Sequence, residues 1–119
     1  MVKPSTVTVL MIEVEPGEGI SSRKLVLETA KRNVITAYSA EHGIELLHRF
    51  PNVDAVIVHS KLDEPYTEVV KSARTLLPET PSILLSPTGT DTCRDCTAVV
   101  SSHDPRLLLD TLEKMFPTN

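Results

Sequence analysis

Short apolar runs alternate along the chain with longer stretches in which apolar residues recur every three or four positions. Five of the runs are rich in Val, Ile and Leu, and their lengths are typical of strands buried on both faces of a sheet. One run ends at His59, after a polar turn that begins at Pro51. The other four runs cover residues 7–12, 34–38, 82–85 and 97–100.

Three stretches between the runs and one after the last run predict amphipathic helices, over residues 23–32, 39–50, 67–77 and 105–116. Ser39 is placed to cap the second helix, and Pro105 suits the first turn of the last one. The span from Ser86 to Ser101 has too few residues for a full helix between the fourth and fifth strands. We therefore predict that the helix expected there, the fourth of a regular alternation, is short or missing.

This alternation of strands and helices indicates an α/β protein with right-handed parallel connections and a doubly wound sheet. The flavodoxin-like strand order 2-1-3-4-5 suits five strands, and its switch point lies between strands one and three. The sequence thus predicts a single domain over residues 1–119. Glu13, at the end of strand one, is expected beside His59, at the end of strand three.

Composition and charge narrow the range of functions. The 119 residues are 40% hydrophobic and 24% charged, which is ordinary for a soluble globular protein. No apolar run approaches the ~20 residues of a membrane span, and the N-terminal residues lack a signal-peptide core, so we expect a cytoplasmic protein without membrane contact. The net charge is −4, and the largest basic cluster is Arg23 and Lys24. Direct nucleic-acid binding is therefore not expected.

The two cysteines, Cys93 and Cys96, stand in a C-x-x-C spacing. Thiols at this spacing can form a redox pair or half of a zinc site. A second C-x-x-C is absent, and the pair lies late in the chain rather than at the start of a helix after an early strand. An isolated motif of this kind is weak, so two incidental thiols in a loop is the favoured interpretation.

The chain resembles response-regulator receiver domains over residues 6–116. The resemblance rests on the strand that ends at His59, on the helix opening Ala40-Glu41-His42-Gly43-Ile44-Glu45-Leu46-Leu47, and on the helix entry Asp104-Pro105-Arg106-Leu107-Leu108-Leu109. It implies the flavodoxin-like fold, a role in two-component signal transduction, and protein partners such as a sensor kinase or an output domain. A homodimer is left open.

The residues that carry phosphoryl chemistry in that family are changed in this chain. His59 stands where the family has the phosphate-accepting Asp, and Glu13 with Val14 stand where two adjacent acids would hold Mg²⁺. Ser86 matches the hydroxyl residue that closes strand four, whereas Ser101 aligns with the lysine after strand five. Mg²⁺ prefers several hard oxygen ligands, and the transferred group needs cationic stabilisation. The resemblance therefore predicts a degenerate phosphorylation pocket without catalytic residues or a cofactor.

Three functions follow from these residues. The favoured one is a pseudo-receiver, a protein-protein interaction module that signals without phosphorylation and is not an enzyme. The second is an atypical phosphorelay receiver in which His59 accepts the phosphoryl group, set against a histidine that merely fills the pocket and hydrogen-bonds to Glu13. The third is a metal or redox site. Its candidate ligands, on loops expected to converge at one edge of the sheet, are Cys93, Cys96, His59 and His103.

Overall fold

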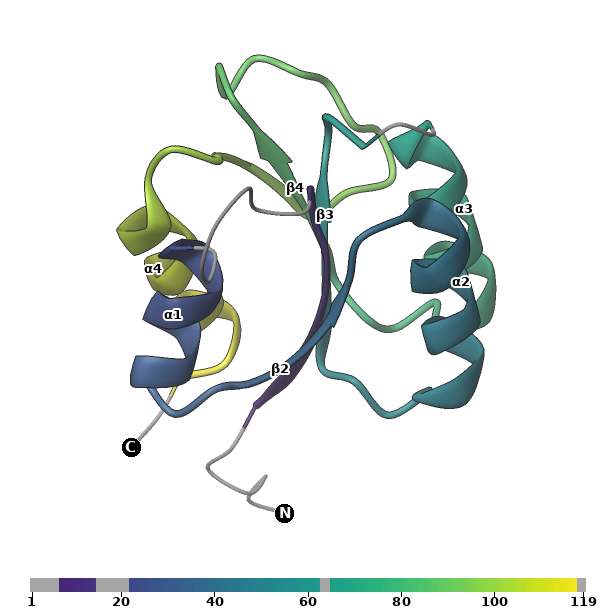
Figure 1. The fold of residues 1–119 in the computed structure, drawn as a ribbon, viewed down its shortest axis with the longest axis horizontal. Helices are drawn as coiled ribbons and strands as arrows, with labels where there is room; N and C mark the ends of the chain where they lie inside the picture. Colours follow the sequence, from purple (N-terminus) through teal and green to yellow (C-terminus); the bar gives the residue numbers. More distant parts are fainter. Residues whose placement is uncertain (1–6, 15–21, 63–64, 118–119) are drawn as a thin grey trace.

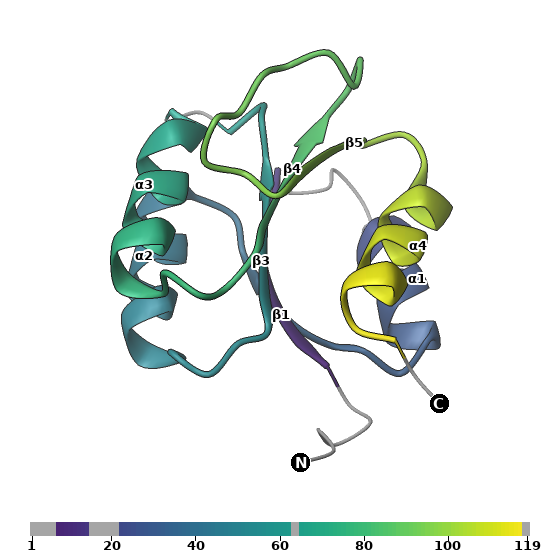
Figure 2. The same cartoon turned by 180° about the vertical axis from the view of Figure 1, so that it is seen from behind.

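The structure is a computed structural model, and it describes residues 7–14, 22–62 and 65–117. Five parallel strands form one sheet in the order β2-β1-β3-β4-β5 (Figures 1 and 2). This confirms the predicted strand order. The strands are β1 (Thr8–Ile12), β2 (Asn33–Ala37), β3 (Ala55–His59), β4 (Ser82–Ser86) and β5 (Ala98–Ser101).

Four helices cover the two faces of the sheet, as the doubly wound fold requires. Helices α1 and α4 lie on one face, and α2 and α3 lie on the other (Figures 1 and 2). The described segment between β4 and β5 contains no helix, which confirms that the fourth helix of a regular alternation is missing. The helices are α1 (Ser22–Thr29), α2 (Ala40–Arg49), α3 (Tyr66–Leu76) and α4 (Pro105–Met115).

Local hydrogen bonds explain where two helices begin. The Ser39 hydroxyl oxygen accepts the backbone N–H of His42 at 3.1 Å at the start of α2. The Asp104 carboxylate accepts the backbone N–H of Leu107 at 3.1 Å at the start of α4. Such side chains satisfy backbone donors that the first turn of a helix leaves without a partner. Helix α1 ends earlier than the pattern predicts, because Lys31 adopts a left-handed conformation with φ of 63°.

The sheet has a separate hydrophobic core on each face. Leu10 and Ile12 of β1 point toward α2 and α3, whereas Val9 and Met11 point toward α1 and α4. All residues of β3 and β4 are buried, as expected for central strands of a parallel sheet. Within the described part of the chain, no helix has the length and apolar character needed to cross a membrane.

Candidate functional site at the carboxyl edge of the sheet

The polar residues singled out in the sequence lie at the carboxyl edge of the sheet. His59 ends β3, Ser86 ends β4 and Ser101 ends β5, with Ser86 directly paired to Ser101. Glu13 follows β1, whose last residue pairs with the residue before His59. Parallel strands bring their carboxyl ends to a single edge, and this edge is where open α/β sheets bind ligands. The predicted set is therefore gathered in one place.

Glu13 is fully buried and forms an ion pair with Arg23 of α1. A terminal guanidinium nitrogen of Arg23 contacts Oε1 of Glu13, and the other terminal nitrogen donates to the backbone carbonyl of Ser102 at 2.7 Å. The Arg23 side chain is 20% exposed, and burial lowers its pKa from the ordinary value. One guanidinium thus joins the residue after β1 to the residue after β5.

Sequence reasoning missed Arg23, which the helical pattern assigns to the polar side of its helix. The signal that could have found it is its place in the first turn of α1. In a βα unit the first turn of the helix lies near the carboxyl edge of the sheet, so a long basic side chain there can reach the site.

The donor set at this edge does not fit the Mg²⁺ site that the receiver resemblance implies. Val14, at the position of the second acid, offers no ligand and is 40% exposed. Oε2 of Glu13 is buried without a hydrogen-bond partner among the described residues, while Oε1 already contacts Arg23. A carboxylate neutralised by a guanidinium is a poor partner for a cation that prefers several oxygen ligands in an octahedron.

His59 is 6% exposed, and its ring is held by the loop that follows β3. Its Nδ1 accepts the backbone N–H of Lys61 at 3.0 Å. The prediction that His59 hydrogen-bonds to Glu13 is wrong. Oε1 of Glu13 contacts Arg23, and Oε2 of Glu13 has no hydrogen-bond partner among the described residues. Burial lowers the pKa of His59 to about 4, and the positive charges of Arg23, His103 and Lys61 act in the same direction. The imidazole is therefore neutral near pH 7, with its proton on Nε2.

The hydroxyl groups at the ends of β4 and β5 bond to their own loops. The Ser86 hydroxyl donates to Oδ2 of Asp91 at 2.6 Å and also accepts the backbone N–H of Gly89 at 3.1 Å. The bond from Ser86 lowers the pKa of the Asp91 carboxyl. Ser101 accepts the backbone N–H of His103 at 3.2 Å. Ser101 therefore supplies no cation where the family has a lysine.

Cys93 and Cys96 lie in the loop between β4 and β5, as expected, but they form a disulfide rather than two separate thiols. Both side chains pack against the core on the α2/α3 face of the sheet. Among the described residues, no group of three or more His, Cys, Asp or Glu side chains is placed to hold a metal ion. The structure thus does not bring together the four candidate ligands Cys93, Cys96, His59 and His103.

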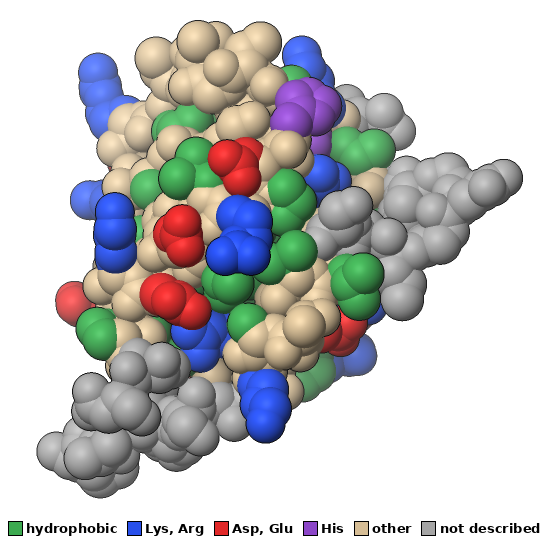
Figure 3. Space-filling view, turned by 90° about the vertical axis from the view of Figure 1, so that its left-hand side faces the viewer, with side chains coloured by type: hydrophobic (Ala, Val, Ile, Leu, Met, Phe, Trp, Pro, Cys, Tyr) green, Lys and Arg blue, Asp and Glu red, His purple; other side chains and the backbone are tan. Residues whose placement is uncertain are grey.

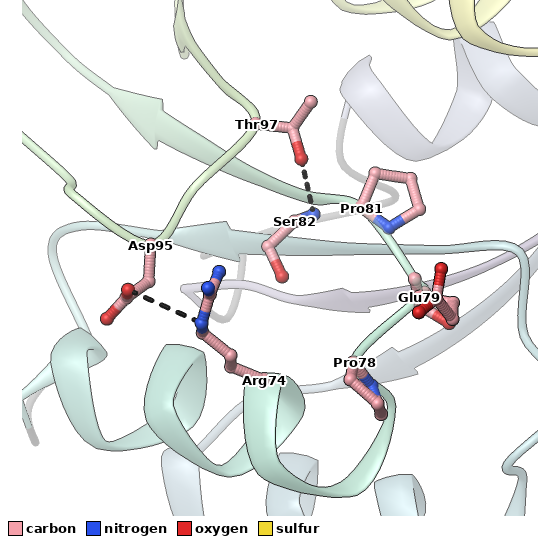
Figure 4. A pocket seen from close by; sticks show the side chains of 8 residues that line it. Arg74, Pro78, Glu79, Pro81, Ser82, Asp95 and Thr97 are labelled. Carbon is pink, nitrogen blue, oxygen red and sulfur yellow. Dashed lines mark hydrogen bonds and ion pairs between the residues drawn. The ribbon is translucent and has the colours of Figure 1, made fainter.

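A small cavity of about 180 Å³ lies at the opposite, amino edge of the sheet (Figure 4). Nε of Arg74 lies 3.7 Å from Oδ1 of Asp95, and Figure 4 shows this pair on one side of the cavity. The backbone N–H of Ser82 donates to the hydroxyl of Thr97 at 3.4 Å. This cavity is separate from the candidate site because it lies where β4 and β5 begin. Its lining residues are Arg74, Pro78, Glu79, Thr80, Pro81, Ser82, Asp95 and Thr97.

No protein-family model matches the sequence, and no curated protein matches it significantly. The fold is similar to several solved receiver structures. A CheY-like receiver domain protein from Methanospirillum hungatei JF-1 is 21% identical, with a TM-score of 0.74 over 92% of this chain and 93% of that one. The receiver domain of the hybrid histidine kinase CckA is 18% identical, with a TM-score of 0.74 over 90% and 96%. A sensor protein from Polaromonas sp. JS666 is 18% identical, with a TM-score of 0.76 over 91% and 94%. At these identities the likeness establishes the receiver-like fold and no more.

Proposed function

We propose that this chain is a cytoplasmic pseudo-receiver of two-component signalling, a module that binds other proteins without being phosphorylated and is not an enzyme. The observation that carries the proposal is the bridge from the Arg23 guanidinium to Glu13 and to the carbonyl of Ser102. The bridge neutralises the carboxylate that a receiver would use for a divalent cation. It also ties β1 to the residue after β5 without any phosphoryl group.

Phosphoryl transfer to a carboxylate needs an acceptor, a metal ion and cationic stabilisation of the transferred oxygens. In this site the acceptor position holds a neutral imidazole, and Ser101 replaces the lysine. Arg23 is a cation near the site, but its terminal nitrogens already contact Glu13 and Ser102. Each of the three requirements is therefore changed, and restoring one of them leaves the other two unmet.

The alternative, in which His59 accepts the phosphoryl group, needs a free imidazole lone pair. Nδ1 uses its lone pair to accept the backbone N–H of Lys61, and the neutral ring then carries its proton on Nε2. Neither ring nitrogen has a lone pair available for attack on phosphorus. The geometry of His59 therefore favours a histidine that fills the site over a phosphohistidine.

Protein binding needs a folded domain with an accessible surface, but it does not need phosphoryl transfer. Two of the similar structures come from a hybrid histidine kinase and a sensor protein. We accordingly place a sensor kinase or an output domain among the partners. The face formed by α1 and α4 exposes Leu25 and Leu107, and Figure 3 shows hydrophobic side chains between charged ones on this side of the molecule. Reversible protein interfaces have this mixed composition.

Phosphodonor treatment tests the proposal directly. Amide spectra of the 119-residue chain would be recorded with Mg²⁺ and either acetyl phosphate or beryllofluoride. A receiver domain that has the complete acceptor set would serve as the positive control. We expect no specific shifts in this chain, and the same result for His59→Asp. Saturable shifts around Glu13, His59 and Ser86, or phosphorylation of the single variant, would show that the site is a latent receiver.

The binding part of the proposal needs a second measurement. Purified kinase phosphotransfer domains and output domains from the same cell would be titrated onto the isotopically labelled chain. We expect at least one of them to bind with a dissociation constant that the phosphodonor does not change. Affinity that appears only with the phosphodonor would contradict phosphorylation independence.

A further inference from the structure

The segment from residue 87 to residue 97 takes the place of a helix. It leaves the end of β4, runs toward the side of the sheet that carries α3, and returns to β5 (Figures 1 and 2). Its single disulfide, Cys93 to Cys96, lies near the return. Both half-buried cysteine side chains pack on the α2/α3 core, where the side chains of a covering helix would otherwise lie.

One hydrogen bond and one ion pair also join this segment to α3. The Tyr66 hydroxyl, at the start of α3, donates to the carbonyl of Thr92 at 3.3 Å. Nε of Arg74, two turns further along α3, lies 3.7 Å from Oδ1 of Asp95, with the Arg74 side chain 66% exposed and the Asp95 side chain 38% exposed. An exposed ion pair and a single neutral hydrogen bond each stabilise a contact only weakly. The position of the segment on α3 therefore depends strongly on the packing of the disulfide between these two contacts.

The disulfide is expected to contribute little to the stability of the whole domain. It closes a loop with only two intervening residues, and so short a loop restricts the unfolded chain little. Both hydrophobic cores are built mainly from the strands and the helices, and the cysteines lie at the margin of one of them. Loss of the disulfide is therefore expected to act on the segment and not on the fold.

We propose that Cys93 and Cys96 form a reversible dithiol–disulfide site, and that its redox state controls how residues 87–97 lie on α3. The reductant is a dithiol, either a small molecule or a protein. Its thiolate attacks one cysteine sulfur, which breaks the Sγ–Sγ bond, forms a mixed disulfide and releases the other cysteine as a thiolate. The second thiol of the reductant then attacks the mixed disulfide. Two electrons and two protons pass to the cysteines, and the reductant leaves as its own disulfide.

The site has the features that this exchange needs. The sulfurs belong to half-buried side chains in an irregular segment, so an attacking thiolate can approach without unfolding the sheet. The inference goes beyond the proposed signalling role, because it concerns the packing of this segment on the α2/α3 face and a different chemistry.

The test uses the oxidised 119-residue chain in native buffer with graded ratios of reduced to oxidised dithiothreitol. Free thiols would be trapped with a maleimide and counted by mass, while circular dichroism follows the fold. We expect two trapped thiols in a folded protein and recovery of the disulfide on reoxidation. Amide hydrogen exchange should accelerate by about tenfold or more in residues 87–97 and along the facing side of α3, and remain unchanged in β1 and β3.

Variants separate a local effect from a global one. The double variant Cys93→Ser with Cys96→Ser should reproduce the exchange pattern of the reduced chain without added reductant. Arg94→Ala, in the same segment, should keep the disulfide and the slow exchange. The proposal is wrong if the disulfide resists reduction until the protein is denatured. It is equally wrong if reduction or the double variant unfolds the whole domain, or if reduction leaves the exchange of residues 87–97 unchanged.

Discussion

Arg23 shows how the charge balance of a site can depend on a residue outside the strands that form it. Glu13 is fully buried, and a buried carboxylate is costly unless a cation or several hydrogen bonds compensate its charge. Arg23 supplies that cation from α1 and uses its other terminal nitrogen on the carbonyl of Ser102. The negative charge of Glu13 is therefore compensated without a metal ion. A second acid at the position of Val14 is not needed to hold one.

Replacing Arg23 with methionine should remove the cation while keeping the apolar stem. Because Glu13 would be left buried and unpaired, we expect the free energy of unfolding to fall by about 3 kcal/mol in urea titrations. The matched control is Arg49→Met, which removes an exposed pair with Glu45 on α2 and should cost about 0.5 kcal/mol or less. Adding Glu13→Gln to Arg23→Met should recover part of the loss. Equal effects of Arg23→Met and Arg49→Met would contradict the structural role of the bridge.

His59 should make stability depend on pH in a defined window. Its pKa is about 4 in the folded protein and 6.5 in the unfolded chain, so between these values the unfolded chain binds a proton that the folded protein does not. The free energy of unfolding should therefore fall as the pH is lowered from 6.5 to 4, by about 3 kcal/mol, and His59 should contribute no slope above that window. Urea titrations across this pH range measure the effect.

Two variants assign that slope to one residue. His59→Asn should remove it, because asparagine does not titrate. His42→Asn should leave it in place, because His42 is exposed on α2 and only its backbone N–H contributes to the cap. If both variants kept the pH dependence of the free energy of unfolding, His59 would not be its source.

At the scale of single elements, α2 packs closely on β1 at Gly43. A Cβ atom placed on Gly43 would lie 2.5 Å from Cγ1 of Ile12, a fully buried side chain. The helix can approach the sheet this closely because glycine has no side chain. Gly43 therefore serves packing here, although glycine usually weakens a helix.

Gly43→Ala should test this packing. Alanine stabilises a helix interior by about 1 kcal/mol relative to glycine, but overpacking a rigid core costs about 1 to 3 kcal/mol. Because Ile12 is β-branched and buried, we expect the clash to dominate and the free energy of unfolding to fall by about 1 to 2 kcal/mol. Lys71→Ala, on the exposed surface of α3, is the control and should change stability by less than about 0.5 kcal/mol. An increase in the melting temperature of Gly43→Ala would show that the helix can move away.

At the scale of the whole molecule, the strand order places residues from distant parts of the chain at one edge. His59, Ser86 and Ser101 end three strands and Glu13 directly follows a fourth, and they meet at one edge because the strands are parallel. The same edge receives the first turn of α1, which adds Arg23. A substitution at one of these positions therefore changes contacts with elements that are far away in the sequence.

The apolar runs were sufficient to predict the elements and their order. The predicted strand over residues 34–38 appears as β2 (Asn33–Ala37), and that over 82–85 appears as β4 (Ser82–Ser86). Hydrophobic periodicity reports burial directly, which is why the elements and the missing fourth helix were predictable. The end of α1 was not, because the left-handed turn at Lys31 depends on how the chain enters β2 rather than on the helical pattern.

The sequence by itself determined the fold class and the edge of the sheet at which the candidate residues gather. Only the tertiary structure decided the partners of those residues: Arg23 for Glu13, the Lys61 backbone for His59, and Cys96 for Cys93. The physical reason is that apolar burial depends on a periodic pattern that can be read locally. The pairing of polar side chains depends instead on which of several possible partners each side chain reaches once the elements have packed.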